Sequence, residues 1–354
     1  MRQLCLLGNP GSRRTVFLEQ AAAQAGTAFC FLDWKDWEHA AELWGRAEAE
    51  QETDWFVKID PPLWDSCCLK ELDGLTLEYR QHLAELSRLA QSISVTFWNP
   101  PEVIEMLLDK ETCKQRLTAA GLPVTETVPL LSGDAGKKDS VKVLLEQMDS
   151  MGICQIFLKP IRGSGAAGVS ALRVQPRTGR MALYTCAALH PVYGLVNTRH
   201  LRRISDRREI TELLGEILGL GCMAERWYAK AEHQGFSYDL RVVVQEGRMD
   251  YVLARLSRGP ITNLHLNNHP LETEALGLAP KVMASVRALC LQAMACFPAL
   301  RSAGIDILLE KGSLRPRIIE MNAQGDLIYQ DIFQENRIYR RQAERMKQWL
   351  EEVP

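Results

Sequence analysis

The chain has 354 residues, of which 46% are hydrophobic and 24% charged, and its formal net charge is −2. This length fits two or three lobes with a buried core, and the charge excludes the basic excess typical of proteins that bind nucleic acids or membrane surfaces. The ten cysteines show no zinc spacing, no apolar run approaches the roughly 20 residues that span a bilayer, and no secretory leader pattern is present, so we expect a cytoplasmic protein with reduced thiols.

The first 100 residues predict a small α/β lobe. A strand over Gln3–Leu7 breaks into a glycine- and proline-containing loop, a helix follows over Thr15–Ala25, and the apolar residues 28–32 form the next strand. This strand–helix–strand order is typical of a parallel sheet with a crossover helix. The remaining elements expected in this lobe are strands over Trp55–Ile59 and Val95–Trp98 and a helix over Glu78–Leu89.

From residue 101 onward the chain predicts a second, larger unit. It begins with a helix over Glu102–Ala120 that we expect to break near Asp109, and a polar linker is expected over Ser132–Ser140. A capping box, Asp206-x-x-Glu209, opens a helix that ends near Gly219. Further helices are expected over Val141–Met151, Pro280–Cys296 and Asn336–Val353, and strands over Ile153–Lys159, Val169–Val174, Met223–Tyr228, Asp239–Gln245 and Met249–Leu256.

A glycine-rich loop follows Lys159. Its glycines, Gly163, Gly165 and Gly168, have the spacing G-x-G-x-x-G, but a strand follows them and the next acid is Asp206. Dinucleotide folds need a helix after the glycines and an acid about 20 residues on, so that fold is excluded. Strand, loop and strand instead predict a hairpin lid whose amides fold over phosphates, and an ordinary glycine-rich turn is the alternative.

Three oxygen-bearing side chains interrupt two apolar runs near the C-terminus. The runs 304–309 and 317–322 are separated by turn residues and predict a β-hairpin that sets Asp306 opposite Glu320, with Asn322 on the same face. Two carboxylates and an amide form a hard-oxygen site suited to Mg²⁺. The alternative is a hairpin with one solvated face.

The order of these features resembles the ATP-grasp superfamily. Within it, the chain is most similar to the RimK-like ligases that append glutamates to a ribosomal protein and to glutathione synthetase. The resemblance covers about residues 101–330 and rests on Asp109-Lys110, Lys159 with its glycine loop, Glu225–Tyr228, Asp239–Val242, Arg255, Thr262–His265, Asp306, Glu320 and Asn322. It implies an α/β (α+β) ATP-grasp fold: a Rossmann-like pre-ATP-grasp domain at residues 1–100, then an ATP-grasp domain at 101–354. That domain would divide into a lid at about 122–222, a catalytic core at about 223–335 and a C-terminal helix at 336–353.

The resemblance also implies roles for single residues. The ATP-binding set would be Lys110 and Lys159 on the phosphates, Gly163, Ser164, Gly165 and Gly168 in the closing loop, Glu225, Arg226, Trp227 and Tyr228 at the adenine hinge, and Glu232 on the ribose. Asp306, Glu320 and Asn322 would hold Mg²⁺, with Mn²⁺ as the alternative metal. Arg241, Arg255 and Asn263 would be catalytic, the arginines near the transferred phosphate and the acyl group.

The activity implied is a carboxylate–amine ligase that forms an acyl-phosphate and releases ADP and phosphate. Its partners would be an amino-acid-like donor and a small-molecule or peptide acceptor, without nucleic acid or membrane, and a homo-oligomer is left open. Two alternatives are a small-molecule kinase on the same fold and a non-catalytic nucleotide-binding protein.

Other readings of these residues stay open. Lys110 is alternatively a solvated helix charge, Glu246 competes with Glu232 for the ribose, and both arginines are alternatively paired with acids across the sheet. For His265 we expect a structural role.

Substrate-facing positions depart from the ribosomal-protein ligases. Ile261 stands where those ligases carry an arginine, for which Arg258 is a candidate substitute, and Asn267-Asn268 replace paired glycines. A different acceptor is therefore expected, which the long segment Pro176–Ser205 is a candidate to recognise.

Overall fold

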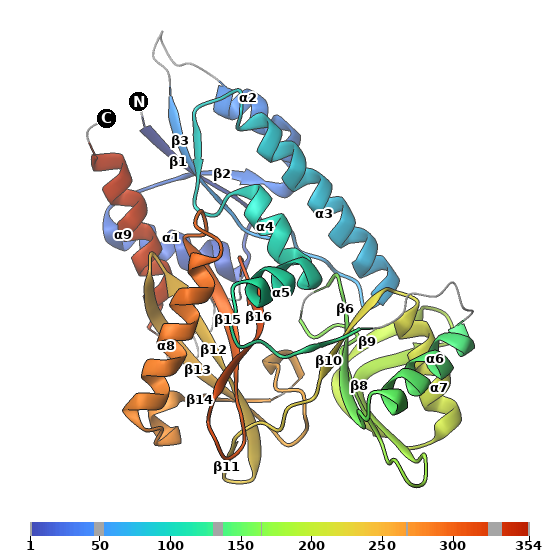
Figure 1. Ribbon diagram of the computed structural model, residues 1–354. Helices are drawn as coiled ribbons and strands as arrows, with labels where there is room; N and C mark the ends of the chain where they lie inside the picture. The colour runs from blue at the N-terminus through green and yellow to red at the C-terminus, as the bar shows by residue number, and fades with distance from the viewer. Residues whose placement is uncertain are drawn as a thin grey trace.

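A computed structural model describes residues 2–45, 53–129, 137–163, 165–266, 268–324 and 335–352. Three sheets organise these residues: a four-stranded parallel sheet in the N-terminal lobe and two mainly antiparallel six-stranded sheets that follow it (Figure 1). The helices in these ranges are all too short or too polar to cross a membrane. The expected mixture of helices and sheets, with a parallel N-terminal sheet, is confirmed.

The N-terminal lobe contains a sheet with the strand order β2-β1-β3-β4, all parallel. Its strands are β1 (Arg2–Gly8), β2 (Cys30–Asp33), β3 (Asp54–Ile59) and β4 (Val95–Phe97), and its helices are α1 (Arg13–Ala25), η1 (Trp34–His39), α2 (Ala40–Gly45) and α3 (Leu69–Leu89). Leu4 and Leu6 pack in one cluster with α1 and with α9 (Arg337–Glu351), whereas Cys5 and Leu7 pack in another with α2 and α3. The helices that follow β1 and β3 thus cover opposite faces, which opens a crevice at the carboxyl ends of these two strands.

One helix of this lobe differs from expectation. Helix α3 begins at Leu69 rather than at Glu78, and Gly74 lies inside it. A glycine costs about 1 kcal/mol in a helix, but Leu69 is buried in the apolar core of the next sheet, and this packing outweighs the local preference. The expected C-terminal helix is α9, which packs against α1, so that both ends of the described chain lie together (Figure 1).

The second sheet contains strands from the segment predicted to be a lid. Its elements are β5 (Thr127–Val128), α6 (Lys137–Ser150), β6 (Gln155–Pro160), β7 (Ser170–Val174), β8 (Met181–His190), β9 (Gly194–Ile204), α7 (Arg207–Leu218) and β10 (Cys222–Arg226). Strands β6 and β7 pair antiparallel on either side of the glycine loop, as predicted. Asp206 caps α7 by accepting from the Glu209 amide at 2.8 Å. Of the predicted linker, residues 132–136 lie outside the described ranges, and 137–140 belong to α6.

The third sheet forms the core. Its elements are β11 (Glu232–His233), β12 (Phe236–Gln245), β13 (Arg248–Ser257), η2 (Leu264–Leu266), β14 (His269–Glu272), η3 (Thr273–Leu276), α8 (Pro280–Ala295), β15 (Ser302–Leu309) and β16 (Pro316–Asn322). The sheet order is β14-β13-β12-β15-β16. Strand β12 is therefore the neighbour of β15, although β13, β14 and α8 separate the two strands in the sequence. The predicted hairpin is confirmed, with Asp306 opposite Glu320 and Gly304 opposite Asn322.

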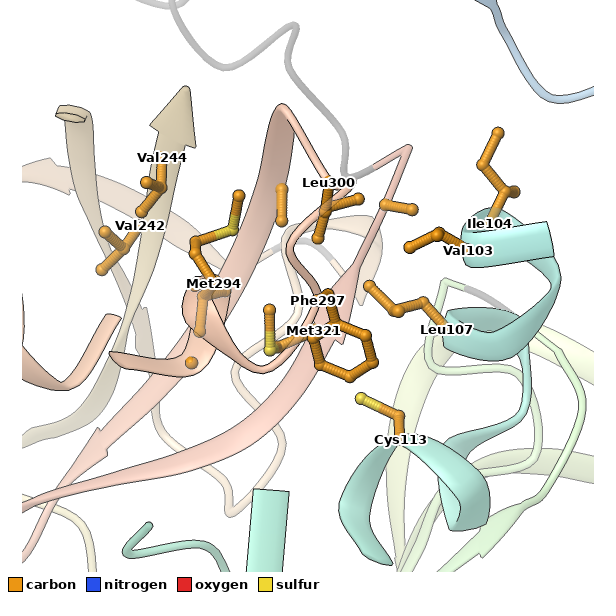
Figure 2. Close-up of a cluster of buried hydrophobic side chains, with 14 of the residues drawn as sticks. Val103, Ile104, Leu107, Cys113, Val242, Val244, Met294, Phe297, Leu300 and Met321 are labelled. Atoms are coloured by element: carbon orange, nitrogen blue, oxygen red, sulfur yellow. The ribbon is translucent and has the colours of Figure 1, made fainter. Parts of the chain in front are cut away.

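Two short helices attach this core to the first lobe. They are α4 (Pro101–Leu108) and α5 (Lys110–Ala119), and the predicted break falls at Asp109, whose side chain accepts from the Thr112 amide at 2.9 Å and caps α5. Figure 2 shows side chains of α4 and α5 facing Phe297 and Met321 on the core side. This packing fixes Lys110, the first residue of α5, beside the core hairpin.

Candidate functional site

A buried carboxylate, Glu225 at the end of β10, holds two lysines. Its Oε2 lies 2.8 Å from Lys159 Nζ on the neighbouring strand β6, and its Oε1 pairs with Lys114 Nζ on α5. Thr125 Oγ1 also donates to Glu225, at 2.7 Å. Burial disfavours the charge on this carboxylate, but the two ammonium groups outweigh it and lower the pKa of Glu225 to about 2. The same burial lowers the pKa of Lys114 to about 8 despite its contact with Glu225.

The glycine loop comes back to the same place. Lys110 Nζ donates to the Gly163 carbonyl, and the Lys110 amide donates to Ile161 O at 3.4 Å. Gly168 has a φ of 70°, and a Cβ there would lie 2.8 Å from Pro160 Cγ, so only glycine fits this close approach. Asn197 of β9 accepts from the Gly168 amide at 3.3 Å, which ties the loop to the outer hairpin of the lid. Ser164 is outside the described residues.

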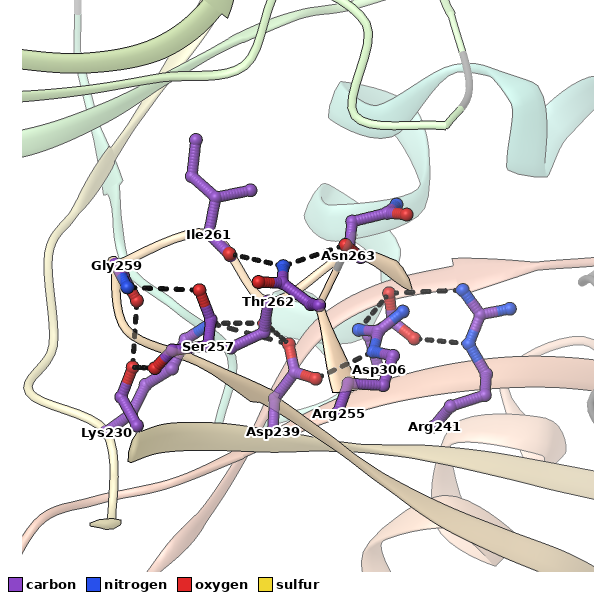
Figure 3. Close-up of polar contacts among 12 residues, drawn as sticks. Lys230, Asp239, Arg241, Arg255, Ser257, Gly259, Ile261, Thr262, Asn263 and Asp306 are labelled. Carbon is purple, nitrogen blue, oxygen red and sulfur yellow. Dashed lines mark hydrogen bonds and ion pairs between the residues drawn. The ribbon is translucent and has the colours of Figure 1, made fainter. Parts of the chain in front are cut away.

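An ion-pair network crosses the core sheet beneath the loop (Figure 3). Arg241 and Asp306 face each other on β12 and β15, and Arg241 Nε and Nη2 donate to the two Asp306 oxygens at 2.5 and 3.3 Å. Arg255 forms two ion pairs, one with Asp306 at 3.0 Å and one with Asp239 at 2.7 Å. All four side chains are buried. Burial alone would raise the pKa of Asp239, but the charges of Arg255 and Lys230 outweigh this effect and hold that pKa below its usual range. The pairing of both arginines with acids across the sheet, left open by the sequence, is therefore present.

Lys230 extends this network toward the hinge. Its Nζ lies 3.4 Å from Asp239 Oδ2 and 2.7 Å from Thr262 Oγ1. Burial lowers the pKa of Lys230 against the opposing effect of Asp239.

The face expected to hold a metal carries the predicted oxygens. Asp306 and Glu320 are direct cross-strand partners, and Asn322 follows two residues later on the same strand. Asp306 already accepts two hydrogen bonds from Arg241 and forms an ion pair with Arg255 at 3.0 Å, so both of its oxygens are engaged by guanidinium groups. Within the described residues, no three His, Cys, Asp or Glu side chains cluster as a metal site. The oxygen chemistry fits Mg²⁺, provided that Glu320 and Asn322 supply most of the protein ligands.

These groups surround two adjoining cavities. One, of about 90 Å³, is lined by Lys159, Glu225, Tyr228, Asp306 and Glu320, among others. The second, of about 560 Å³, lies between the N-terminal lobe and the core. Asn263 lines both, and the ion pair of Arg241 with Asp306 connects them, since one partner lines each cavity.

A narrow space beside the smaller cavity is lined by Lys110, Lys114, Lys159 and Glu320. Lys159 and Glu320 therefore line both of these spaces together.

Comparison of the whole structure with solved structures identifies its architecture. The macrocyclase MdnC of Microcystis aeruginosa MRC, bound with the precursor peptide MdnA, is similar over 98% of this chain and 100% of its own, with 13% identity and a TM-score of 0.58. A RiPP-associated ATP-grasp ligase of Chryseobacterium gregarium, in complex with ADP and a leader and core peptide, is similar over 100% and 98%, with 13% identity and a TM-score of 0.57. The ATP-grasp ligase PsnB, complexed with minimal precursor, Mg and ADP, covers 99% and 98% at 13% identity and a TM-score of 0.55. The chain has the ATP-grasp fold.

No family model matches the sequence, and a search of curated proteins finds no match either. The likeness of the ATP-grasp fold is thus visible in the structure while sequence identity stays at 13%.

The residues predicted to form the adenine hinge do not all face the smaller cavity. Arg226 and Tyr228 line the smaller cavity, and the Arg317 guanidinium lies 4.4 Å over the Tyr228 ring. Trp227 instead contacts Phe157 and Tyr184 at centroid distances of 5.3 and 6.1 Å.

Three further predicted positions lie in different surroundings. Glu232 is exposed on β11 and pairs with Lys311 at 2.7 Å, apart from the residues that line the two cavities. Arg258 lies 5.1 Å over the Phe236 ring, whereas His265 is exposed and lines the larger cavity. Their predicted roles stay predictions.

Sequence reasoning missed Lys114 and Lys230, and it named Thr262 only as part of the motif Thr262–His265, without a role. Lys114 follows Lys110 by one helical turn, a spacing that puts both on one face of α5, and this was the available signal. Lys230 and Thr262 carried no comparable pattern, because their approach to Asp239 depends on how the hinge and the loop after β13 fold over the sheet.

Proposed function

We propose that this chain is an Mg²⁺- and ATP-dependent ligase that joins a carboxylate to an amine and releases ADP and phosphate. The observation that carries the proposal is the junction of two cavities at Asn263, one rich in lysines and carboxylates and one large enough for an organic substrate. A carboxylate placed at this junction would meet the terminal phosphate of a nucleotide whose phosphates enter the smaller cavity. At about 90 Å³ that cavity would have to widen to admit the rest of the nucleotide.

The chain's own residues suit this chemistry. Phosphoryl transfer depends on positioning and on cations around the transferred group, and Lys159 and Lys110 offer such cations from β6 and α5. Arg241 and Arg255, fixed by Asp306 and Asp239, place two guanidinium groups beside the junction. Mg²⁺ bound by Glu320, Asn322 and Asp306 would neutralise phosphate charge there.

The glycine loop supports the second half of the reaction. An acyl-phosphate is hydrolysed by water unless the site is covered, and the loop lies over the junction, with Gly165 in the wall of the larger cavity. An amine that reaches the acyl-phosphate under this cover would displace phosphate and form the amide.

The substrates are proposed at the level of class. An amino-acid-like donor and a peptide acceptor, or a peptide carrying both groups, agree with the precursor peptides present in the similar structures of MdnC and of PsnB. A small-molecule acceptor is the remaining choice.

The test is ATP turnover with a chemical trap. Purified protein is expected to be stabilised thermally by Mg·ATP and to release ADP when a donor acid is added. Hydroxylamine should then convert the acyl-phosphate to a hydroxamate. ADP release with a phosphorylated hydroxyl and no hydroxamate would assign the chain to the kinases instead, and nucleotide binding without ADP release would make it a non-catalytic nucleotide-binding protein.

A further inference from the structure

The larger cavity has an unusual charge composition. Its described lining includes Arg13, Arg14, Arg241 and His265 and no acidic residue. The smaller cavity differs, because its lysines and arginines are matched by Glu225, Asp239, Asp306 and Glu320. The charge of its lining therefore favours a negatively charged ligand in the larger cavity.

The arginines of this wall come from two different elements. Arg241 is near the junction, but its guanidinium is already engaged by Asp306. Arg13 and Arg14 come from the first turn of α1, on the N-terminal lobe. Arg14 is held by the Gln324 carbonyl at 2.9 Å, whereas Arg13 is exposed and shows no side-chain partner among the described residues.

The fold explains why a ligand would lie here. Asn9 and Arg13 follow β1, and Pro61 to Trp64 follow β3, so the cavity occupies the crevice at the carboxyl ends of two strands whose helices lie on opposite faces. The amide end of α1 adds a positive potential to that of Arg13, since no acid lies in its first turn. Asp60, the buried carboxylate at the end of β3, is paired with Lys58.

Apolar side chains also line the cavity. Leu63, Trp64 and Leu107 line the cavity between the lobe and the core, and its volume of about 560 Å³ lies in the range of about 300–1,000 Å³ usual for small-ligand sites. Such a wall suits the methylene groups of a chain that carries an anion at each end.

We infer that this cavity holds the donor acid and that the donor carries a second carboxylate, which Arg13 binds while the reacting carboxylate lies near Asn263. This inference rests on the proposed function and names its donor class: a dicarboxylic acid, or a peptide in which one carboxylate reacts and another is recognised. Arg13 is a specificity-determining residue that binds the substrate away from the reacting atoms.

The test measures binding and needs no turnover. Calorimetry with Mg·ADP present compares glutarate with its monoamide, glutaramate, and the dipeptide N-acetyl-Glu-Ala with its C-terminal amide. Within each pair only the second carboxylate is lost. We expect the dianion of at least one pair to bind at least tenfold more tightly; preference in the glutarate pair alone indicates a free acid, and preference in the dipeptide pair indicates a peptide.

Arg13→Gln should abolish this preference, and Arg13→Lys should keep part of it. Arg287→Gln, an exposed arginine on α8 away from the cavity, is the matched control and should leave the preference unchanged. The inference is overturned if both members of each pair bind alike, if no probe binds, or if Arg13→Gln retains the preference. An intact preference without hydroxamate formation would count against the ligase proposal alone, and hydroxamate formation without a preference would count against this inference alone.

Discussion

Lys159 lies in the wall of both the smaller cavity and the narrow space beside it, so under the proposed function we expect it to contribute most to binding the phosphates. Lys159→Ala should reduce ADP release on the order of 10²-fold, the usual cost of removing one preorganised charge partner of a transition state. Initial rates at saturating Mg·ATP test this. Lys142→Ala, which removes an exposed lysine on α6, should have no effect. A Lys159→Ala enzyme with unchanged rates would place the phosphates elsewhere.

Glu320 tests the face expected to bind Mg²⁺. Its side chain is only half buried, so Glu320→Ala should abolish turnover while changing the free energy of unfolding by less than about 1 kcal/mol. Urea unfolding and rates across a Mg²⁺ titration measure both. A strongly destabilised variant would indicate a structural role for this carboxylate.

The ionisation of Glu225 makes the free energy of unfolding depend on pH. Its pKa is about 2 in the fold against 4.5 as the ordinary value, so the charged form stabilises the protein above pH 4.5 and this contribution is lost as pH falls from 4.5 to 2. At about 1.4 kcal/mol per pKa unit, the contribution is about 3 kcal/mol. Urea unfolding should show Glu225→Gln less stable than the wild type at pH 7, with the difference shrinking below pH 4.5.

The matched control is Glu212→Gln, an exposed carboxylate on α7. A constant gap between the wild type and Glu225→Gln across this pH range would mean that the carboxylate gains no protection from its lysines.

Among the elements, the glycine loop depends on its contact with β6. Gly168→Ala places a Cβ 2.8 Å from Pro160 Cγ, next to Lys159, so the loop must shift. We expect a lower kcat and a higher KM for ATP with an intact fold. Gly152→Ala, with a similar φ of 62° but no atom within 4 Å, controls for backbone strain and should keep normal kinetics. Normal kinetics of Gly168→Ala would show that loop position does not limit turnover.

Local patterns predicted several elements well. The turn after Leu309 set the register of Asp306 with Glu320, and Asp109 and Asp206 marked helix starts because a capping side chain acts on its own neighbours. Strand β9 was missed, since three exposed arginines (Arg199, Arg202 and Arg203) hide its alternation. The pairing of Arg241 with Asp306 requires β12 to lie beside β15, which no local pattern encodes.

At the scale of the whole molecule, Asn99 joins the first lobe to the core. Its Nδ2 donates to the carbonyls of Ser302 and Ala323 at 2.9 and 2.6 Å, and its Oδ1 accepts from the amides of Arg301 and Ser302 at 2.9 and 3.1 Å. Asn99→Ala leaves these buried groups without partners and should lower the free energy of unfolding by about 3 kcal/mol. Urea denaturation measures this loss.

Gln91→Ala, an exposed residue just before β4, is the control for Asn99→Ala and should be neutral. A loss below about 1 kcal/mol for Asn99→Ala would show that the lobes dock through apolar packing alone.

Glu225, which bridges Lys114 and Lys159, also affects which anions can bind at these lysines. An anion that binds Lys159 must displace Glu225, which is buried, ionised and in direct contact with this lysine. Inorganic phosphate or bicarbonate would offer Lys159 few contacts in exchange, whereas a metal-bound polyphosphate would offer several at once. Under the proposed function, this ion pair would therefore favour the nucleotide over small free anions.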